Sequence, residues 1–436
     1  MFSQLFGKYL VDKGVIQQNS LDEVLKNQQS ARVKLGTIAV SAGMLTEAEA
    51  EEINHVQTHE DKRFGDIAVE RGYLSEKQVC EILERQGDSF MKFLQLLTDE
   101  LKISVSQVDA YLASYQKEHG FTDVEMESMK REDVDAICAL YAYAAKPYVT
   151  DIAALVLRNL TRFVSGNYYI DKIEKTEEYS YQCLVGQKIH GDHTIYLAFG
   201  EDGGEGALAL ASGFAKESYS EIGAVCYDAM AEFSNICSGL FASDMSRMGV
   251  DIDMEPPYVY ENQCAKGSAY VVPIHIDGKV IKLYIAVDSE ISLGTTPYVL
   301  KIAKAEGSQV TDSSKGTVMI VDDSLLIRKM LRKIVEEHGY TVVAEAVNGA
   351  EAVEEYKKYR PDVITLDITM PVMDGLEALE VIKAYDDNVK AIMITAAGQQ
   401  GKVIEAIRHG AAHFMMKPFH EAEVIEGLEG VFSSIR

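Results

Sequence analysis

Four apolar runs in the last third of the chain end in side chains that could do chemistry. The end residues are three carboxylates, one hydroxyl and one ammonium group: Asp322, Asp323, Asp367, Thr395 and Lys417. Clustered carboxylates supply the hard oxygen ligands that Mg²⁺ takes, and without a cation they would raise one another's pKa. Beside such a cation a carboxylate can stay ionised and act as a nucleophile. These residue types predict magnesium-dependent chemistry at one of the carboxylates.

Short buried strands must bring these residues together. The runs are rich in β-branched and aliphatic residues: Val318–Val321, Val363–Leu366, Ile392–Ile394 and Phe414–Met416. Met370-Pro371 and Asp374-Gly375 force a loop before the next helical run. Alternating strands and helices predict a parallel, doubly wound sheet, whose ligand site lies beyond the carboxyl ends of the strands. We therefore expect the five side chains in a single crevice.

Residues 317–436 resemble a CheY-like receiver domain of two-component signalling. The landmarks occur in order: Val321-Asp322-Asp323-Ser324, Asp367, Met370-Pro371, Asp374-Gly375, Thr395-Ala396 and Lys417-Pro418-Phe419. The resemblance implies an α/β fold with a five-stranded parallel sheet in the order 2-1-3-4-5. It implies that Asp367 accepts a phosphoryl group from a histidine kinase. Its implied Mg²⁺ ligands are Asp322, Asp323, Asp367 and the backbone carbonyl of Thr369.

The other receiver residues have roles that suit their chemistry. Lys417 would bring positive charge to the phosphoryl oxygens, and Thr395 would donate from its hydroxyl. Movement of Thr395 toward the phosphoryl group would let Phe414 turn inward as a switch. Phe414 stands where the family often has Tyr, so a contact through that hydroxyl is lost. Thr369 is small and neutral, which leaves that side of the acyl phosphate open to water.

Residues 149–300 predict an α+β domain. The expected elements are a helix at Asp151–Val164, alternating stretches at Ile173–Val185, Thr194–Ala198 and Ala207–Leu210, a long helix from about Ser218 to Met248, and strands at Ser268–Ile276 and Val280–Val287. Asp277-Gly278 between the last two is a strong hairpin signal. An antiparallel sheet with long helices packed on it is the expected result.

The long helix carries Glu232 and Asn235, three positions apart and so on one face. This stretch resembles the CheX/CheC family of chemotaxis phosphatases, whose signature is Glu-x-x-Asn on an exposed helix, so we expect this face to be exposed. The resemblance implies that Asn235 orients the attacking water and that Glu232 holds the active-site lysine of a phosphorylated CheY-like receiver. Val156 stands three before Asn159, where a second site would need Glu, so we expect one site. A homodimer through this domain is a further expectation.

Residues 1–88 contain a repeat of 29 residues. Its markers are Phe6-Gly7, Leu35-Gly36 and Phe64-Gly65, then Gly14, Gly43 and Gly72, then Gln28, Gln57 and Gln86. Each unit predicts a short helix, a glycine stop, an apolar pair and a second helix. Ser75 with Gln78, and Thr46 with Glu49, fit capping boxes that open two of the second helices. Such units bury their apolar faces against one another.

The repeats resemble the N-terminal module of type II secretion and pilus assembly ATPases. Members of the MshEN type bind cyclic di-GMP through copies of a motif led by Arg-Leu-Gly. The leading positions here are Leu5, Lys34 and Arg63, so the first copy lacks the basic residue. Two alternatives stay open, a docking module without a ligand and a nucleotide site at Lys34 and Arg63. Residues 89–148 predict a helical connector or the tail of the repeats.

Composition narrows the functional class. A net charge of −26 would repel nucleic acid and anionic membranes, so DNA binding is not expected. The six cysteines show no metal or redox spacing, and no run is long and apolar enough for a membrane span. We expect a cytoplasmic protein. Its domains would be a repeat module at 1–88, a connector at 89–148, the CheX-like domain at 149–300, a linker at 301–316 and the receiver at 317–436.

Two functions remain open at this point. One is an aspartyl-phosphate phosphatase governed by its own receiver. The other is a response regulator without catalysis in the middle domain, which would then serve dimerisation, while the repeats bind a partner or cyclic di-GMP. Because the chain stops at Arg436, soon after the last receiver helix, we expect no transcriptional output. Glu232 and Asn235 together favour the phosphatase.

Overall fold

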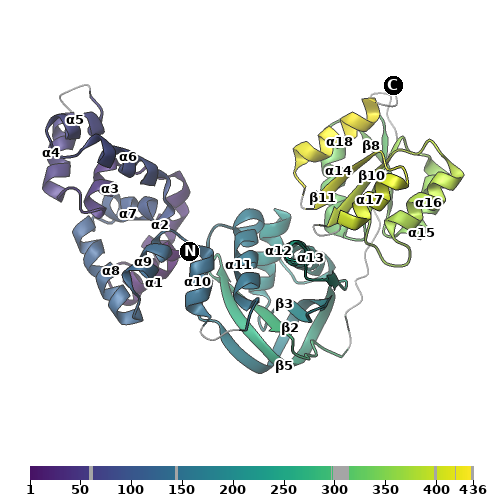
Figure 1. The fold of residues 1–436 in the computed structure, drawn as a ribbon, viewed down its shortest axis with the longest axis horizontal. Helices are drawn as coiled ribbons and strands as arrows, with labels where there is room; N and C mark the ends of the chain where they lie inside the picture. Colours follow the sequence, from purple (N-terminus) through teal and green to yellow (C-terminus); the bar gives the residue numbers. More distant parts are fainter. Residues whose placement is uncertain are drawn as a thin grey trace. The chain divides into compact units, whose positions relative to one another are not determined.

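The computed structural model describes residues 1–57, 62–142, 146–295, 297, 314–396, 400–417 and 419–433. These residues form two compact units, Met1–Ala144 with Gly166–Lys172, and Ala145–Ser165 with Ile173–Arg436. The first unit is almost entirely helical, and the second contains two sheets (Figure 1). Most of the expected linker, 301–313, and Pro418 of the Lys417-Pro418-Phe419 landmark lie outside the described residues.

The repeats form three pairs of helices. They are α1 (Phe2–Asp12) with α2 (Gln18–Asn27), α3 (Leu35–Ser41) with α4 (Glu47–Gln57), and α5 (Phe64–Glu70) with α6 (Glu76–Glu84); 3₁₀ turns η1 (Gln28–Ser30) and η2 (Arg85–Gly87) follow α2 and α6. Gly14, Gly43 and Gly72 end the first helix of each pair at φ values of 70°, 66° and 75°. A residue with a Cβ would be strained in this left-handed conformation, which explains glycine at each stop.

The helices that follow the repeats belong to the same unit. They are α7 (Ser89–Asp99), α8 (Val105–His119), α9 (Asp123–Lys130) and α10 (Val134–Tyr141), and strand β1 (Tyr168–Ile170) is grouped with them. Phe90 of α7 lies 5.1 Å from Phe2, and Tyr115 of α8 lies 5.9 Å from Phe6, between ring centroids. These buried aromatic contacts join the expected connector to the first repeat.

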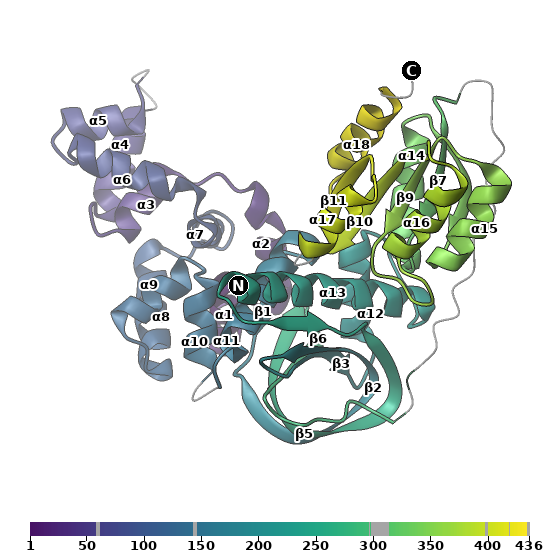
Figure 2. The same cartoon turned by 45° about the vertical axis from the view of Figure 1, so that its right-hand side comes forward.

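The middle domain is built on an antiparallel sheet that closes on itself. Its strands are β2 (Glu174–Gly191), β3 (Ile195–Glu201), β4 (Ile252–Met254), β5 (Tyr258–Ile276) and β6 (Lys279–Val287). The order runs β5-β6-β3-β2-β4, and β2 also pairs with β5, so four strands form a ring, as Figure 2 shows. Asp277 and Gly278 join β5 to β6 with φ values of 49° and 80°, as the hairpin signal requires.

Three helices pack against this sheet. They are α11 (Val149–Asn159), continued by a π-helical turn η3 (Leu160–Val164), α12 (Glu205–Ala215) and α13 (Ala224–Arg247). The expected strand at Ala207–Leu210 is wrong, because those residues lie in α12. Alanine and leucine are strong helix formers, and the Glu201 carboxylate accepts from the amides of Gly206 and Ala207 at 3.0 and 2.9 Å. The long helix begins after Gly223, six residues later than expected.

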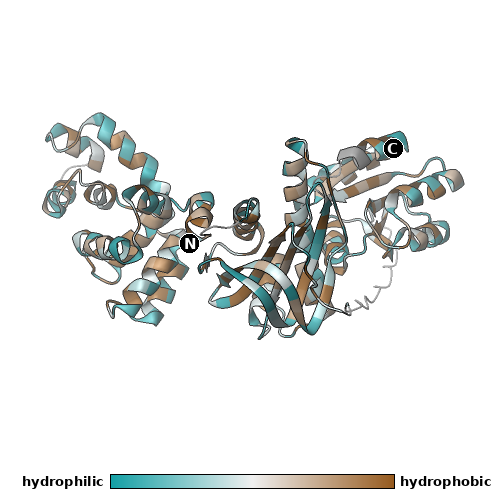
Figure 3. Ribbon diagram, turned by 60° about the horizontal axis from the view of Figure 1, so that its bottom comes forward, coloured by the Kyte–Doolittle hydropathy of each residue, from teal (hydrophilic) through white to brown (hydrophobic). Residues whose placement is uncertain are grey.

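The receiver region is a parallel sheet between two layers of helices (Figure 1). Its elements in chain order are β7 (Thr317–Val321), α14 (Leu325–Glu337), β8 (Thr341–Ala346), α15 (Gly349–Tyr359), β9 (Val363–Asp367), α16 (Gly375–Tyr385), β10 (Ala391–Ala396), α17 (Gln400–Arg408), β11 (His413–Lys417) and α18 (Glu421–Ser433). The strand order β11-β10-β9-β7-β8 confirms the predicted 2-1-3-4-5 arrangement. Figure 3 shows apolar residues concentrated on the strands, with mixed faces on the covering helices.

Candidate active site

The carboxyl ends of β7 and β9 bring three carboxylates together. Asp322, Asp323 and Asp367 each place one oxygen within 4.8 Å of the others. Asp322 and Asp367 are buried, while Asp323 is partly exposed. Burial, together with the neighbouring Asp322, raises the pKa of Asp323 well above its ordinary value. This oxygen-only donor set, partly open to solvent, fits Mg²⁺.

Lys417, at the end of β11, neutralises part of this charge. Its Nζ lies 2.9 Å from Asp322 Oδ2, an ion pair without hydrogen-bond alignment, and donates to Asp367 Oδ2 at 3.2 Å. Burial acts to lower the pKa of Lys417, but the surrounding carboxylates hold it well above its ordinary value. Lys417 is therefore a fixed positive charge at the carboxylate that the sequence singles out.

Arg328 supports the loop that carries the carboxylates, a role that the sequence motifs did not indicate. Its side chain is fully buried, and Nη1 donates to the carbonyls of Asp322 and Asp323 at 2.7 and 3.2 Å. Its Nε donates to buried Glu345 on β8 at 3.3 Å. A buried Arg needs such partners, because an unpaired charge there is costly. A basic residue one turn into an otherwise apolar helix face was the available signal.

Gly375 is the residue that lets α16 begin directly beneath Asp367. A Cβ at this position would collide with the backbone carbonyl oxygen of Asp367. We expect Gly375→Ala to lower the free energy of unfolding by about 1–3 kcal/mol, the usual cost of overpacking. Denaturant unfolding measures the change. Gly430→Ala in α18 is the matched control, since its Cβ meets nothing within 4 Å. Equal stability of the two variants would contradict the expectation.

Helix α13 of the middle domain reaches this crevice. Glu232 Oε1 lies 3.8 Å from Lys417 Nζ, and only 6% of the Glu232 residue is exposed. Burial raises the pKa of Glu232 to about 7, although Lys417 acts in the opposite direction. One turn earlier, Asp228 is also buried and contacts the start of α14. The helix face expected to be exposed is thus covered by the receiver.

Asn235 follows Glu232 by one turn and is held by a residue that the sequence did not reveal. Gln187 on β2 donates from Nε2 to Asn235 Oδ1 at 3.0 Å and to the Glu255 carbonyl at 2.9 Å. Gln187 is 1% exposed. On α11, buried Asn159 donates to Cys237 Sγ at 3.7 Å. Asn159 is thereby directed into the packing between α11 and α13.

The remaining receiver residues lie at or near the same end of the sheet. Thr395 is buried at the end of β10, at 1% exposure. The side chain of Thr369 is exposed, and its backbone contributes to the environment of Asp367 through a hydrogen bond. Phe414 on β11 is 43% exposed, the outward position expected before any inward turn. Its switch role stays a prediction.

Lys34 and Arg63 occupy equivalent positions, each preceding the first helix of its repeat. Both are exposed. Lys34 Nζ forms an ion pair with Asp99 at 2.8 Å, beside a hollow of about 230 Å³ that also presents Glu47 and Glu51. Acidic neighbours disfavour a phosphodiester ligand there. The nucleotide-binding role of Lys34 and Arg63 stays a prediction.

Titration with cyclic di-GMP tests that role. Because Asp99 already pairs with Lys34, we expect no measurable heat when the nucleotide is added to the full chain at micromolar concentration. Asp99→Ala frees Lys34 and serves as the matched comparison. Micromolar binding by the unmodified chain that disappears in Arg63→Ala would reverse the expectation and favour the nucleotide site.

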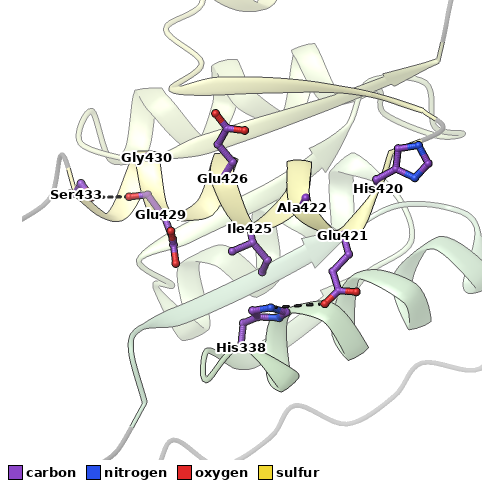
Figure 4. A pocket seen from close by; sticks show the side chains of 9 residues that line it. All are labelled: His338, His420, Glu421, Ala422, Ile425, Glu426, Glu429, Gly430 and Ser433. Atoms are coloured by element: carbon purple, nitrogen blue, oxygen red, sulfur yellow. Dashed lines mark hydrogen bonds and ion pairs between the residues drawn. The ribbon is translucent and has the colours of Figure 1, made fainter. Parts of the chain in front are cut away.

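A surface hollow of about 940 Å³ lies elsewhere on the receiver, along α18 (Figure 4). His338 contacts Glu421 across it at 3.6 Å. None of the strand-end residues lines it, so its size does not mark the chemical site. Across the described residues, no helix has both the length and the apolar character to cross a bilayer.

Comparison with known proteins identifies the region that holds the carboxylates. Residues 318–429 match the response regulator receiver domain. The same region is 53% identical over 112 residues to chemotaxis protein CheY of Listeria monocytogenes, covering 26% of this chain and 94% of the relative. The chain belongs to the response regulator receiver family. The receiver domain is also 50% identical over 114 residues to CheY of Thermotoga maritima, covering 26% of the chain and 95% of that relative.

The middle region of this response regulator has its own match. Residues 183–275 match the family described as chemotaxis phosphatase CheX, so a CheX domain precedes the receiver domain. Both domains belong to chemotaxis and two-component signalling.

Among solved structures, the CheX–CheY–BeF3–Mg²⁺ complex from Borrelia burgdorferi matches at 40% identity, covering 27% of this chain and 88% of that chain, with a TM-score of 0.26. The resemblance of the repeats to the secretion and pilus module stays a prediction.

Proposed function

We propose that this response regulator accepts a phosphoryl group on Asp367 from a histidine kinase, and that its CheX domain hydrolyses aspartyl phosphate on CheY-like receivers. The observation that carries the proposal is the 3.8 Å approach of Glu232 to Lys417, with Asn235 one turn further along α13. In this arrangement Glu232 pairs with the receiver lysine, and Asn235 orients the attacking water.

Asp367 is the proposed nucleophile for phosphorylation. Asp322, Asp323, Asp367 and the Thr369 carbonyl would hold Mg²⁺, which supplies charge neutralisation for the phosphoryl oxygens when bound. Lys417 Nζ, already 3.2 Å from Asp367 Oδ2, would move its donation to a phosphoryl oxygen. The Thr395 hydroxyl would donate to another. These donors stabilise charge that develops during transfer.

Asn235 is the proposed orienting group for hydrolysis. A carboxamide can both accept from and donate to a water, and it does so without titrating. Because Gln187 fixes Asn235 Oδ1 at 3.0 Å, the amide has a defined direction before substrate arrives. A water held in line with the bond to the Asp367 oxygen would need little further ordering.

The direct test measures loss of phosphoryl groups from a purified CheY-like receiver. The full chain with Asp367→Asn, which cannot be phosphorylated itself, is added in catalytic amount. Release of inorganic phosphate above the receiver's spontaneous rate supports the proposal. No release from any CheY-like protein of the source organism, and no accelerated release from the unmodified chain once it is phosphorylated on its own receiver, would leave the CheX domain as a binding platform.

A further inference from the structure

The acidic face of α13 is occupied by the receiver domain of the same chain. Asp228 and Glu232, one turn apart, are 5% and 6% exposed. Asp228 Oδ2 accepts hydrogen bonds from Ser324 Oγ at 3.0 Å and from the Leu326 amide at 2.7 Å. Buried carboxylates are costly unless they are paired, and here both partners come from the receiver. The carboxylates on this face of α13 are therefore complementary to the receiver groups that cover them.

The Asp228 contact is a helix cap supplied from outside α14. The amide of Leu326 is one of the first amides of α14, which have no partner within their own helix. A carboxylate at this end is also favoured by the helix dipole. Since backbone geometry fixes the contact, it sets how α13 lies along the receiver. That placement leaves Glu232 beside Lys417.

We infer that the substrate of the Glu232 and Asn235 site is the phosphorylated Asp367 of the same chain, an inference that rests on the proposed phosphatase function. The oxygen of a water molecule forms a bond to phosphorus, and the bond from phosphorus to the Asp367 oxygen breaks. Its electron pair returns to the carboxylate. One water proton stays on the inorganic phosphate, the other binds to it as well or passes to solvent, and no further reactant is needed.

The docked arrangement also separates phosphorylation from hydrolysis. Asp367 and Lys417 are each 4% exposed with α13 in place. A phosphodonor must approach Asp367 in line, so the donor and α13 compete for the same space. Asp367 is therefore phosphorylated in the undocked state and dephosphorylated in the docked one.

Mixing two variants distinguishes hydrolysis within one chain from hydrolysis between chains. The Asn235→Ala variant keeps the phosphoacceptor Asp367 but lacks the side chain that orients water. The Asp367→Asn variant keeps Glu232 and Asn235 but cannot be phosphorylated. Each chain is labelled with radioactive acetyl phosphate and Mg²⁺, and decay is followed after removal of the donor. We expect unmodified chain to decay at a first-order rate that does not depend on protein concentration. Labelled Asn235→Ala should decay about 100-fold more slowly, even after prior incubation with equimolar Asp367→Asn.

The alternative outcomes are distinct. If Asp367→Asn restores rapid decay of Asn235→Ala, or if the rate rises with protein concentration, hydrolysis occurs between chains and the inference is wrong. If unmodified chain decays no faster than Asn235→Ala but does dephosphorylate a free CheY-like receiver, the inference is also wrong while the proposed function stands. Failure with both substrates contradicts the proposed function itself.

A variant that weakens docking provides a second test, because it should change the rates of dephosphorylation and phosphorylation in opposite directions. We expect Asp228→Asn to weaken docking, and so to slow decay at Asp367 about tenfold while speeding phosphorylation by acetyl phosphate, since hydrogen bonds to a buried charge contribute on that scale. A variant that merely destabilised the protein would not accelerate phosphorylation. Asp244→Asn is the matched control, because Asp244 is exposed on the same helix and pairs with Arg247. Slower phosphorylation in Asp228→Asn than in Asp244→Asn would overturn the inference.

Discussion

Replacing Asp367 with asparagine should abolish phosphorylation of the chain by acetyl phosphate or by a histidine kinase. The substitution keeps the shape of the side chain but removes the nucleophilic oxygen that lies 3.2 Å from Lys417 Nζ. We do not expect Asp322 or Asp323 to take over, because both are proposed to remain ligands of the cation. Intact mass after incubation with the donor and Mg²⁺ measures the result.

Asp387→Asn is the matched control for this experiment. Asp387 is an exposed carboxylate on the loop after α16, away from the strand ends, so its replacement should leave phosphorylation unchanged. Omission of Mg²⁺ should suppress labelling of both the control and the unmodified chain. Undiminished labelling of Asp367→Asn at a single site would mean that another residue is the acceptor.

Replacing Asn235 with alanine should reduce dephosphorylation of an aspartyl phosphate by about two orders of magnitude. The reason is geometric, because Asn235 is the polar side chain one turn beyond Glu232 and is fixed by Gln187. Glu232→Ala should instead weaken docking, since its partner is the receiver lysine. A steady-state assay with a free CheY-like receiver separates these effects as a loss of kcat and a rise in KM.

Ser246→Ala provides the comparison on the same helix. Ser246 is exposed near the end of α13, about three turns beyond Asn235, and its replacement should leave both kinetic parameters unchanged. The activity of Gln187→Ala should lie between those of Asn235→Ala and Ser246→Ala, because this substitution removes the hydrogen bond that fixes Asn235 but keeps the Asn235 side chain. Full activity in Asn235→Ala would show that water is oriented by a different group.

The residues that could be predicted from sequence are those whose pattern is local. The strand ends at Asp367 and Lys417 follow from short apolar runs, and the parallel sheet then places them together. The Ser75 capping box was predicted for the same reason, and both of its hydrogen bonds are present. The prediction of a strand at Ala207–Leu210 was wrong because four residues are too few to distinguish the helical period from the strand period. The cap that favours a helix comes from Glu201, whose position is set by the preceding strand.

Contacts between distant segments could not be predicted in this way. Asp228 lies on the same face as Glu232. The sequence around it does not indicate that the amide of Leu326, 98 residues later, will donate a hydrogen bond to it. The same holds for Gln187 and Asn235, which come from a strand and a helix 48 residues apart. Glu232 was expected on an exposed face because a helical pattern does not show which other domain covers it.

The ion pair between Glu232 and Lys417 joins two domains of one polypeptide, so the inferred hydrolysis would fix the ratio of phosphatase to substrate at one to one. With separate proteins, the lifetime of a phosphorylated receiver depends on how much of each partner the cell makes. The inferred hydrolysis within one chain would make that lifetime a property of the molecule, independent of its copy number. The cell would then lengthen a signal by phosphorylating faster, or through a partner that keeps α13 away from the receiver.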